Sequence, residues 1–346
     1  MKFGVFDHLD RGQVSIQEHF ENRLKLAEIY DRSGFYAYHI AEHHGTPLGM
    51  ASSPSVFLAA VAQRTKKLRF GPLVYTLSLT HPIRIIEEVC MLDQMSGGRL
   101  ELGIGRGSSP YEMGYFGVNA ENSGKLYIES FDVVMMGLKS RVINFEGEHF
   151  NFKNVPIELE CIQKPTPPIW YGMSQPHAVP WAAQNDVNIV CNGPSAPVKA
   201  ITDRYKEVWS EGAHASHKPM PKMGLGRHIV IAQNYDKAYA LGKKGFDKWY
   251  QSLQHLWRAH GNPMTKYSIP EDYDAAVKAG IVLVGTSSQV LDQLQQEIEI
   301  SGVNYILTRF AFGDLSLEES QFSLESFAAE VMPAFESETE IEVAHA

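Results

Sequence analysis

Apolar and polar residues follow a repeating order along the chain: a short apolar run, then a longer segment whose apolar positions recur every three or four residues. The first repeat opens with the apolar run 2–6, which predicts a buried strand. Ser15 and Glu18 then form a capping-box pattern at the start of a helical segment, and Gly34 predicts its end. A second apolar run at 36–40 completes one strand–helix–strand unit.

Eight such apolar runs predict eight strands: 2–6, 36–40, 68–74, 100–104, 169–172, 187–190, 224–232 and 305–310. Strands that alternate with helical segments indicate an α/β protein with a parallel sheet. Eight units favour a closed (β/α)8 TIM barrel over an open sheet. Long insertions after strands 4 and 7 cover 108–164 and 234–281. We expect a single domain over 1–336 and a disordered acidic tail over 337–346.

Composition narrows the functional classes. The 346 residues are 44% hydrophobic and carry a formal net charge of −9, without the basic stripe typical of nucleic-acid binding. The three cysteines are widely spaced and form no CxxC motif. No signal peptide or membrane-spanning run is evident. We therefore expect a cytoplasmic protein that binds neither nucleic acid nor membrane.

Polar residues gather after the predicted strands, where the active sites of such barrels lie. They include Asp7 and His8, and then the cluster Glu42, His43 and His44. The cluster has three interpretations. Adjacent residues rarely bind one metal ion, and no third ligand has suitable spacing, so we expect no metal. A structural histidine pair and an acid–base histidine both remain open, since an imidazole titrates near neutral pH.

The glycine-rich segment 103–107 surrounds Arg106 directly after the fourth strand. It is not a G-x-G-x-x-G motif, so a dinucleotide-binding fold is weakly supported. A tight turn with a surface arginine is one interpretation. The other is an anion pocket, in which the guanidinium of Arg106 binds a phosphate and Ser174 adds a hydroxyl donor.

Two clusters of large apolar side chains lie in the insertions. They indicate either core and interface packing or the wall of an apolar substrate pocket. Their members are Tyr111, Met113, Tyr115 and Phe116 in the first insertion, and Trp249, Tyr250 and Trp257 in the second.

Seven ordered segments resemble the bacterial luciferase-like monooxygenase family, and especially its luciferase α subunit: 1–4, 41–44, 80–82, 92–99, 103–107, 181–184 and 331–333. The resemblance runs from residue 1 to about residue 335. It implies a (β/α)8 barrel that binds flavin at its C-terminal mouth. It also implies a flavin-dependent monooxygenase that takes reduced FMN from a separate flavin reductase. With O2 the flavin forms a C4a-peroxide, which oxygenates a small organic substrate.

The same resemblance assigns roles to residues. His43 corresponds to the catalytic histidine, with His44 as the competitor, and Arg106 to the arginine that binds the FMN phosphate. Leu73–Val74 falls where the family has a non-proline cis peptide against the flavin ring. The expected cofactor-binding residues are Phe6, Leu73, Val74, Tyr75, Gly105, Arg106, Met173, Ser174 and Gln175. We also expect a homodimer.

Two alternatives remain beside the monooxygenase. One is a deazaflavin-dependent oxidoreductase of the same superfamily, which transfers hydride and uses no oxygen. The other is a non-catalytic flavin-binding protein; such relatives tend to have a truncated barrel and no acid–base histidine. The full-length barrel pattern and His43 favour an enzyme.

Overall fold

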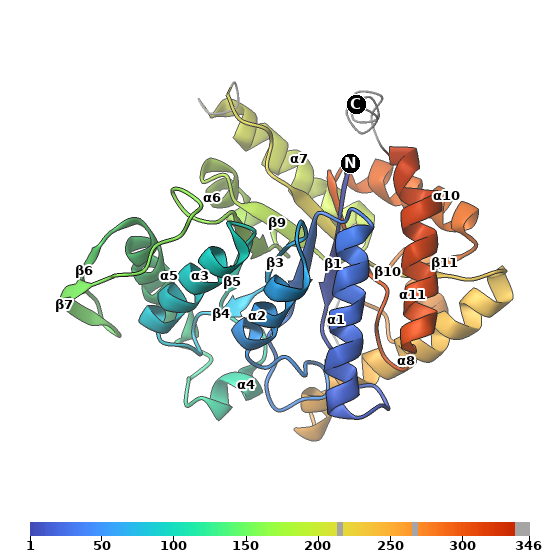
Figure 1. Ribbon diagram of the computed structural model, residues 1–346, viewed down its shortest axis with the longest axis horizontal. Helices are drawn as coiled ribbons and strands as arrows, with labels where there is room; N and C mark the ends of the chain where they lie inside the picture. The colour runs from blue at the N-terminus through green and yellow to red at the C-terminus, as the bar shows by residue number, and fades with distance from the viewer. Residues whose placement is uncertain (213–216, 265–268, 336–346) are drawn as a thin grey trace.

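The computed structural model describes residues 1–212, 217–264 and 269–335, and a ring of parallel strands forms its centre (Figure 1). The ring consists of β1 (Lys2–Asp7), β2 (Ala37–Ile40), β3 (Arg69–Pro72), β4 (Tyr75–Thr76), β5 (Leu102–Gly105), β8 (Ile169–Gly172), β9 (Asn188–Cys191), β10 (Met223–Ile231) and β12 (Tyr305–Arg309). Pairing runs in the order β3-β2-β1-β12-β10-β9-β8-β5-β4. A parallel bridge pairs Phe70 of β3 with Leu100, two residues before β5. The sheet therefore nearly closes, which confirms the barrel.

Two features of the sheet differ from the expected strands. The run expected at 68–74 forms a strand only as far as Pro72, as β3. The Leu73–Val74 bond, which separates β3 from β4, is a non-proline cis peptide as the resemblance implied. The sequence pattern also missed β11 (Val282–Gly285), which pairs with the C-terminal half of β10. On the other edge of that half, the Ser323 hydroxyl bonds the backbone of Ile229 and Ile231. Where β10 extends beyond its pairing with β12, the Ser323 side chain thus supplies the hydrogen bonds that a neighbouring strand would otherwise make.

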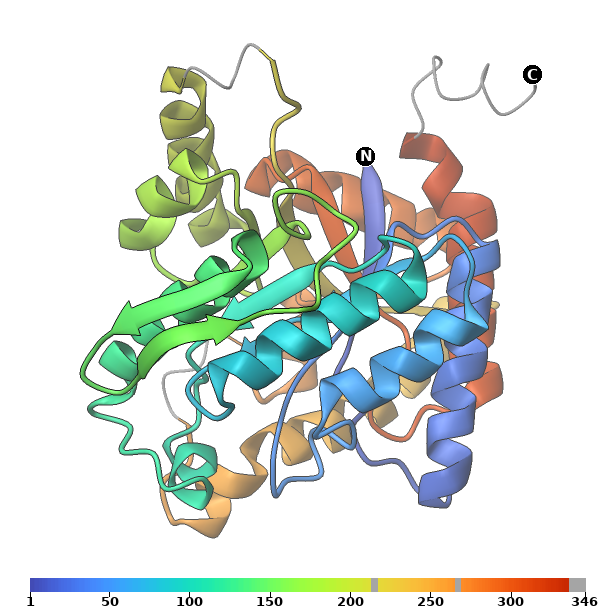
Figure 2. The ribbon, with the colours of Figure 1, turned by 60° about the vertical axis from the view of Figure 1, so that its left-hand side comes forward.

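Helices surround the strands, as Figures 1 and 2 show. They are α1 (Ile16–Arg32), α2 (Pro54–Arg64), α3 (Pro82–Ser96), α4 (Pro110–Tyr115), α5 (Ser123–Lys139), α6 (Val179–Gln184), α7 (Ser195–Glu211), α8 (Tyr235–Ala259), α9 (Tyr273–Lys278), α10 (Ser287–Ser301) and α11 (Leu317–Ser326). Short 3-10 turns at Pro176–Ala178 and Met332–Phe335 and a π-helical turn at Phe327–Val331 complete the set. The Ser15 hydroxyl accepts a bond from the Glu18 amide, which confirms the predicted start of α1.

The two insertions meet over one end of the barrel. The first carries α4, α5 and the antiparallel hairpin of β6 (Val142–Glu146) and β7 (Asn151–Pro156), which projects from the body in Figure 2. The second carries α8 and α9. Tyr111 of α4 stacks on His260 at the end of α8, with ring centroids 4.1 Å apart. The expected tail at 337–346 lies outside the described residues.

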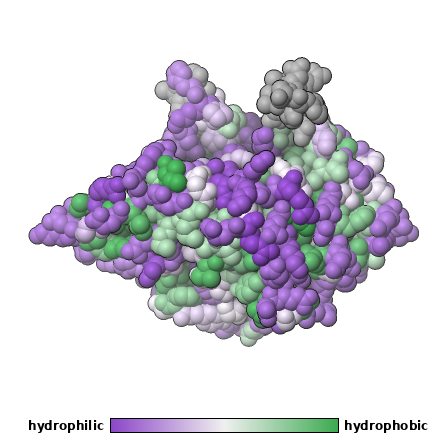
Figure 3. Space-filling view, viewed as in Figure 1, coloured by the Kyte–Doolittle hydropathy of each residue, from purple (hydrophilic) through white to green (hydrophobic). Residues whose placement is uncertain are grey.

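Polar side chains cover much of the face in Figure 3, with apolar ones scattered between them. Among the described residues, no helix has the length and apolar character needed to cross a membrane.

Candidate active site

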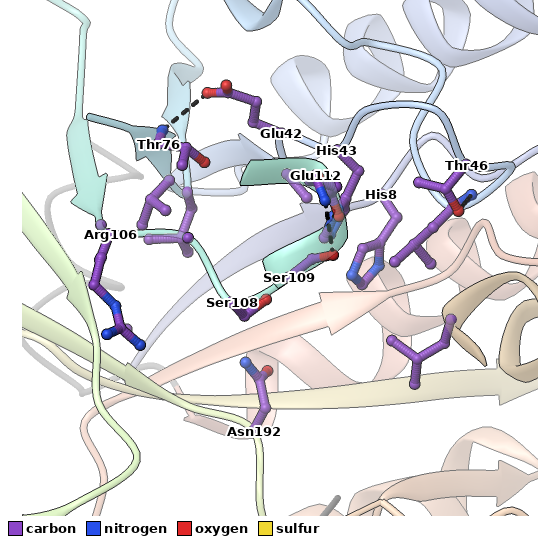
Figure 4. A pocket seen from close by; sticks show the side chains of 18 of the residues that line it. His8, Glu42, His43, Thr46, Thr76, Arg106, Ser108, Ser109, Glu112 and Asn192 are labelled. Carbon is purple, nitrogen blue, oxygen red and sulfur yellow. Dashed lines mark hydrogen bonds and ion pairs between the residues drawn. The ribbon is translucent and has the colours of Figure 1, made fainter. Parts of the chain in front are cut away.

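A cavity of about 610 Å³ opens at the C-terminal ends of the strands (Figure 4). The volume lies within the range usual for sites that enclose small molecules. Residues at the ends of successive strands line it: Phe6 and His8; Ala41, Glu42 and His43; Leu73, Val74 and Thr76; Gly105, Arg106, Gly107, Ser108 and Ser109; Gly172 and Ser174; Val190 and Asn192; and Arg309. This is the edge at which barrel active sites lie.

Each imidazole of the 42–44 cluster has a carboxylate of its own. His43 Nδ1 lies 3.1 Å from Glu112 Oε1, and His44 Nε2 lies 2.9 Å from Glu42 Oε1. The two rings therefore point to different partners, as neighbouring residues in an extended segment do. Among the described residues, no group of three potential ligands is placed to hold a metal ion.

Glu112 determines which nitrogen of His43 faces the cavity. Its Oε2 accepts the backbone amide of His44 at 2.9 Å, which fixes the carboxylate, and the Ser109 hydroxyl caps the start of α4 at the Glu112 amide. An ionised Glu112 accepts a hydrogen bond from Nδ1–H of His43. His43 then presents the lone pair of Nε2, so a neutral His43 acts as a proton acceptor.

Glu42 holds in place the segment that follows the Leu73–Val74 cis peptide and lines one side of the cavity. Its Oε2 accepts the amide of Thr76 at 2.9 Å, the contact drawn in Figure 4. Gly105 lies directly against Val74: a Cβ added at Gly105 would lie 2.6 Å from Val74 Cγ2. A side chain at position 105 would therefore displace this wall, and the glycine keeps a flat, apolar surface.

Arg106 lies at the rim, with its side chain exposed to solvent. Its backbone carbonyl accepts the Ser78 hydroxyl at 2.6 Å, which holds the loop after β5 in place. Within the described part of the chain, no carboxylate pairs with the Arg106 guanidinium. Ser108 and Ser174 line the cavity as well, so a cation and two hydroxyls are available for an anion.

The cavity brings together seven of the expected site residues: Phe6, His43, Leu73, Val74, Gly105, Arg106 and Ser174. Three others do not line it. Tyr75 points into the core, where its hydroxyl lies 2.6 Å from Ser55 Oγ, because successive strand residues face opposite sides. Met173 is also buried in the core, and Gln175 lies outside the lining.

Glu112, Asn192 and Arg309 line the cavity with polar side chains, and none of them was among the sequence candidates. Asn192 follows β9 directly and Arg309 ends β12, so their position at a strand end was the available signal. Glu112 gave no such signal, because it comes from the insertion and reaches His43 only through the fold.

An apolar wall formed largely by α8 and the segment after it closes the remaining side. Its members are Leu48, Trp249, Leu253, Leu256, Trp257, Met264 and Ile269. Met113 adds to the lining from α4. The pocket interpretation thus holds for Met113, Trp249 and Trp257, whereas the other four members of the two aromatic clusters do not line the cavity.

The family model for luciferase-like monooxygenases matches residues 1–305. This chain belongs to the luciferase-like monooxygenase family. An uncharacterized protein, y4wF, from Sinorhizobium fredii is 41% identical over 96% of both chains. The oxygenase component of flavin-dependent trigonelline monooxygenase from Acinetobacter baylyi is 26% identical over 100% of this chain and 98% of the relative.

Solved structures share the fold of this chain. The monooxygenase RslO1 from Streptomyces bottropensis is 25% identical, with a TM-score of 0.87, and the match covers 97% of this chain and 100% of that one. The coenzyme F420 dependent tetrahydromethanopterin reductase from Methanopyrus kandleri is 18% identical, with a TM-score of 0.71 over 97% and 99% of the chains. The fold is thus shared with an F420-dependent enzyme as well as with a monooxygenase, and the fold alone does not identify the cofactor of this chain.

Proposed function

We propose that this protein is the oxygenase component of a two-component monooxygenase. It takes reduced FMN from a separate flavin reductase and uses O2 to oxygenate a small, largely apolar organic substrate. One observation supports this proposal best: a single cavity has the exposed Arg106 at its rim, the His43–Glu112 pair inside it and an apolar wall from α8. The trigonelline relative, itself an oxygenase component, supports the need for a reductase.

The residues of the cavity fit FMN. Arg106, Ser108 and Ser174 supply a cation and hydroxyls suited to a phosphate. The wall of Leu73, Val74 and Gly105 offers an apolar surface suited to a flat ring, and a Cβ at Gly105 would obstruct it. Bound reduced FMN supplies the electrons that activate O2.

His43 performs the proton transfer in this proposal. Glu112 holds its ring and places the acceptor nitrogen toward the cavity, so the imidazole takes a proton from the reacting group and returns it. The apolar wall of α8 keeps water away from the reaction, which limits the wasteful release of hydrogen peroxide.

Cofactor titrations test the proposal. Arg106→Ala should weaken FMN binding about ten- to a hundredfold and riboflavin binding far less, because only FMN carries the phosphate. The measurement is a fluorescence titration of each flavin against the wild-type protein and the variant. Equal losses for both ligands would contradict the phosphate contact. Binding of the deazaflavin F420 but not FMN would favour the hydride-transferring alternative.

A further inference from the structure

His8 lies at the end of β1, inside the cavity and beside the proposed catalytic histidine. Its ring stacks on His43 with the centroids 5.8 Å apart and an interplanar angle of 21°. It also meets Phe6 edge-on at 4.9 Å. Figure 4 places His8 beside His43 and well apart from Arg106. His8 therefore belongs to the part of the cavity away from the proposed phosphate contact.

Trp249 sets the tautomer of His8. The indole Nε1–H is a donor only, and it lies 3.3 Å from His8 Nδ1. Nδ1 must therefore accept, and the proton of a neutral His8 sits on Nε2. Burial and the nearby charge of Arg309 hold the pKa of His8 well below its usual value, so the ring stays neutral near pH 7. No described residue accepts a hydrogen bond from Nε2.

His8 and His43 thus present opposite chemistry. Trp249 makes Nε2 of His8 a donor, whereas Glu112 makes Nε2 of His43 an acceptor. The stacked rings place these two functions side by side.

The groups around His8 favour an electron-rich partner. The guanidinium of Arg309 lies over the Phe6 ring, 4.7 Å from its centroid, and brings positive charge to this part of the cavity. Arg309 also donates to Asn192 Oδ1 at 2.6 Å. Because the oxygen of this amide is engaged, the group that Asn192 can offer to a ligand is its NH2, which is a further donor.

We propose that His8 is a substrate-binding residue: its Nε2–H, fixed by Trp249, binds a carbonyl or similar acceptor oxygen of an otherwise apolar substrate and holds the adjacent carbon beside His43. The substrate class is a largely apolar compound with such an oxygen. This inference rests on the proposed function, but its test needs no turnover.

Two isosteric probes test the donor. Acetophenone carries a carbonyl oxygen where α-methylstyrene carries a CH2 group, and both are otherwise alike. Their dissociation constants are measured by ligand-observed NMR, with and without oxidised FMN. Wild-type protein should prefer acetophenone by about tenfold, because α-methylstyrene has no oxygen to accept the hydrogen bond from Nε2–H. His8→Phe should abolish the preference, and His8→Gln, whose amide nitrogen takes the place of Nε2, should retain most of it.

Trp249→Phe keeps an aromatic ring but removes the donor that fixes the tautomer. The preference should then fall severalfold while His8 remains in place. The matched control is the same glutamine substitution at an exposed histidine, His81→Gln, which should leave both dissociation constants unchanged.

Several results overturn the inference. These are equal binding of the two probes to wild-type protein, no binding of either, or a preference that survives His8→Phe. A loss of FMN affinity in His8→Phe with the probe preference intact would assign the donor to the flavin instead. Failure of FMN to bind wild-type protein would reject the proposed function and leave the probe comparison valid without flavin.

Discussion

At the scale of single residues, the site depends on which atom of each imidazole faces the cavity. His43, His44 and His8 have the same side chain, but Glu112, Glu42 and Trp249 give the three rings different partners. A histidine's role follows from the hydrogen bond at its second nitrogen. Substitutions at these partners are therefore as informative as substitutions at the histidines.

His43→Ala should fold normally and bind FMN within about tenfold of wild type, because the proposed phosphate contact lies elsewhere. Oxygenation should fall at least about a hundredfold, since general acid–base catalysis typically contributes that much. The hydrogen peroxide released per reduced flavin should rise. Product and peroxide are measured together in a single turnover with pre-reduced FMN.

His44→Ala is the parallel variant, and it should perturb this ratio less because His44 pairs with Glu42 rather than facing the reaction. Glu112→Gln should reproduce part of the His43→Ala effect, since an amide no longer fixes the proton on Nδ1. If His44→Ala alone changes the ratio, the two histidines have exchanged roles. If neither changes it, the pair is structural.

At the scale of elements, the repeating pattern predicted every strand of the ring except β4, whose two residues follow the expected run 68–74. Most of these strands are buried along nearly their whole length, which is typical of parallel sheets, whereas β8 is fully buried only at Trp170. β11 was missed because its four residues directly follow the insertion and pair only with the far half of β10. The contact between His43 and Glu112 was beyond the sequence as well, because the two residues are 69 positions apart and meet only when α4 folds over the barrel.

The junction of β3 and β5 closes the barrel and leaves no room for a side chain at Gly71. A Cβ there would lie 1.7 Å from the carbonyl oxygen of Glu101. Next to it, the Glu101 amide donates to the Phe70 carbonyl at 2.8 Å. The close approach of the two backbones therefore requires glycine at position 71.

Gly71→Ala should lower the free energy of unfolding by about 1–3 kcal/mol or more, because the backbones must separate to admit the methyl group. Gly124→Ala is the matched control: nothing lies within 4 Å of its Cβ position in α5, so it should be neutral or stabilise by up to about 1 kcal/mol. Urea unfolding measures both. Equal stability of Gly71→Ala and wild type would show that the junction adjusts freely.

At the scale of the whole molecule, burial of ionisable groups couples the fold to pH. Burial holds the pKa of His8 and of His228 well below the usual value, and lowers that of His39 to about 3 and that of His19 to about 4. Burial also raises the pKa of Asp10 to about 7. Near pH 5, therefore, these four histidines are neutral in the native protein, whereas Asp10 is protonated.

The two kinds of group act in opposite directions. Each histidine's contribution to stability is complete above its unfolded pKa of about 6.5 and is lost as the pH falls, because the unfolded chain takes up the proton. Asp10 contributes stability as the pH falls from about 7 toward 4, because the native state holds its proton. Near pH 5 the unfolded chain holds four more histidine protons than the native protein and lacks the one proton on Asp10, so it binds about three more protons in total. The free energy of unfolding should therefore fall by about 4 kcal/mol for each pH unit of acidification from these groups alone.

His228→Phe isolates one of these protons. Both ring nitrogens of His228 are buried without a hydrogen-bond partner among the described residues, and Phe246, Trp249 and Phe312 meet the ring edge-on at 4.4–5.9 Å. Phenylalanine therefore suits the site.

The His228→Phe variant should match or exceed wild-type stability at about pH 7.5. Its free energy of unfolding should fall about a third less per pH unit between about pH 6 and 5. Urea unfolding across this range measures the slope, with exposed His255→Gln as the control, whose slope should match wild type. An unchanged slope in His228→Phe would mean that the native protein accepts the proton at His228, and that burial there does not exclude it.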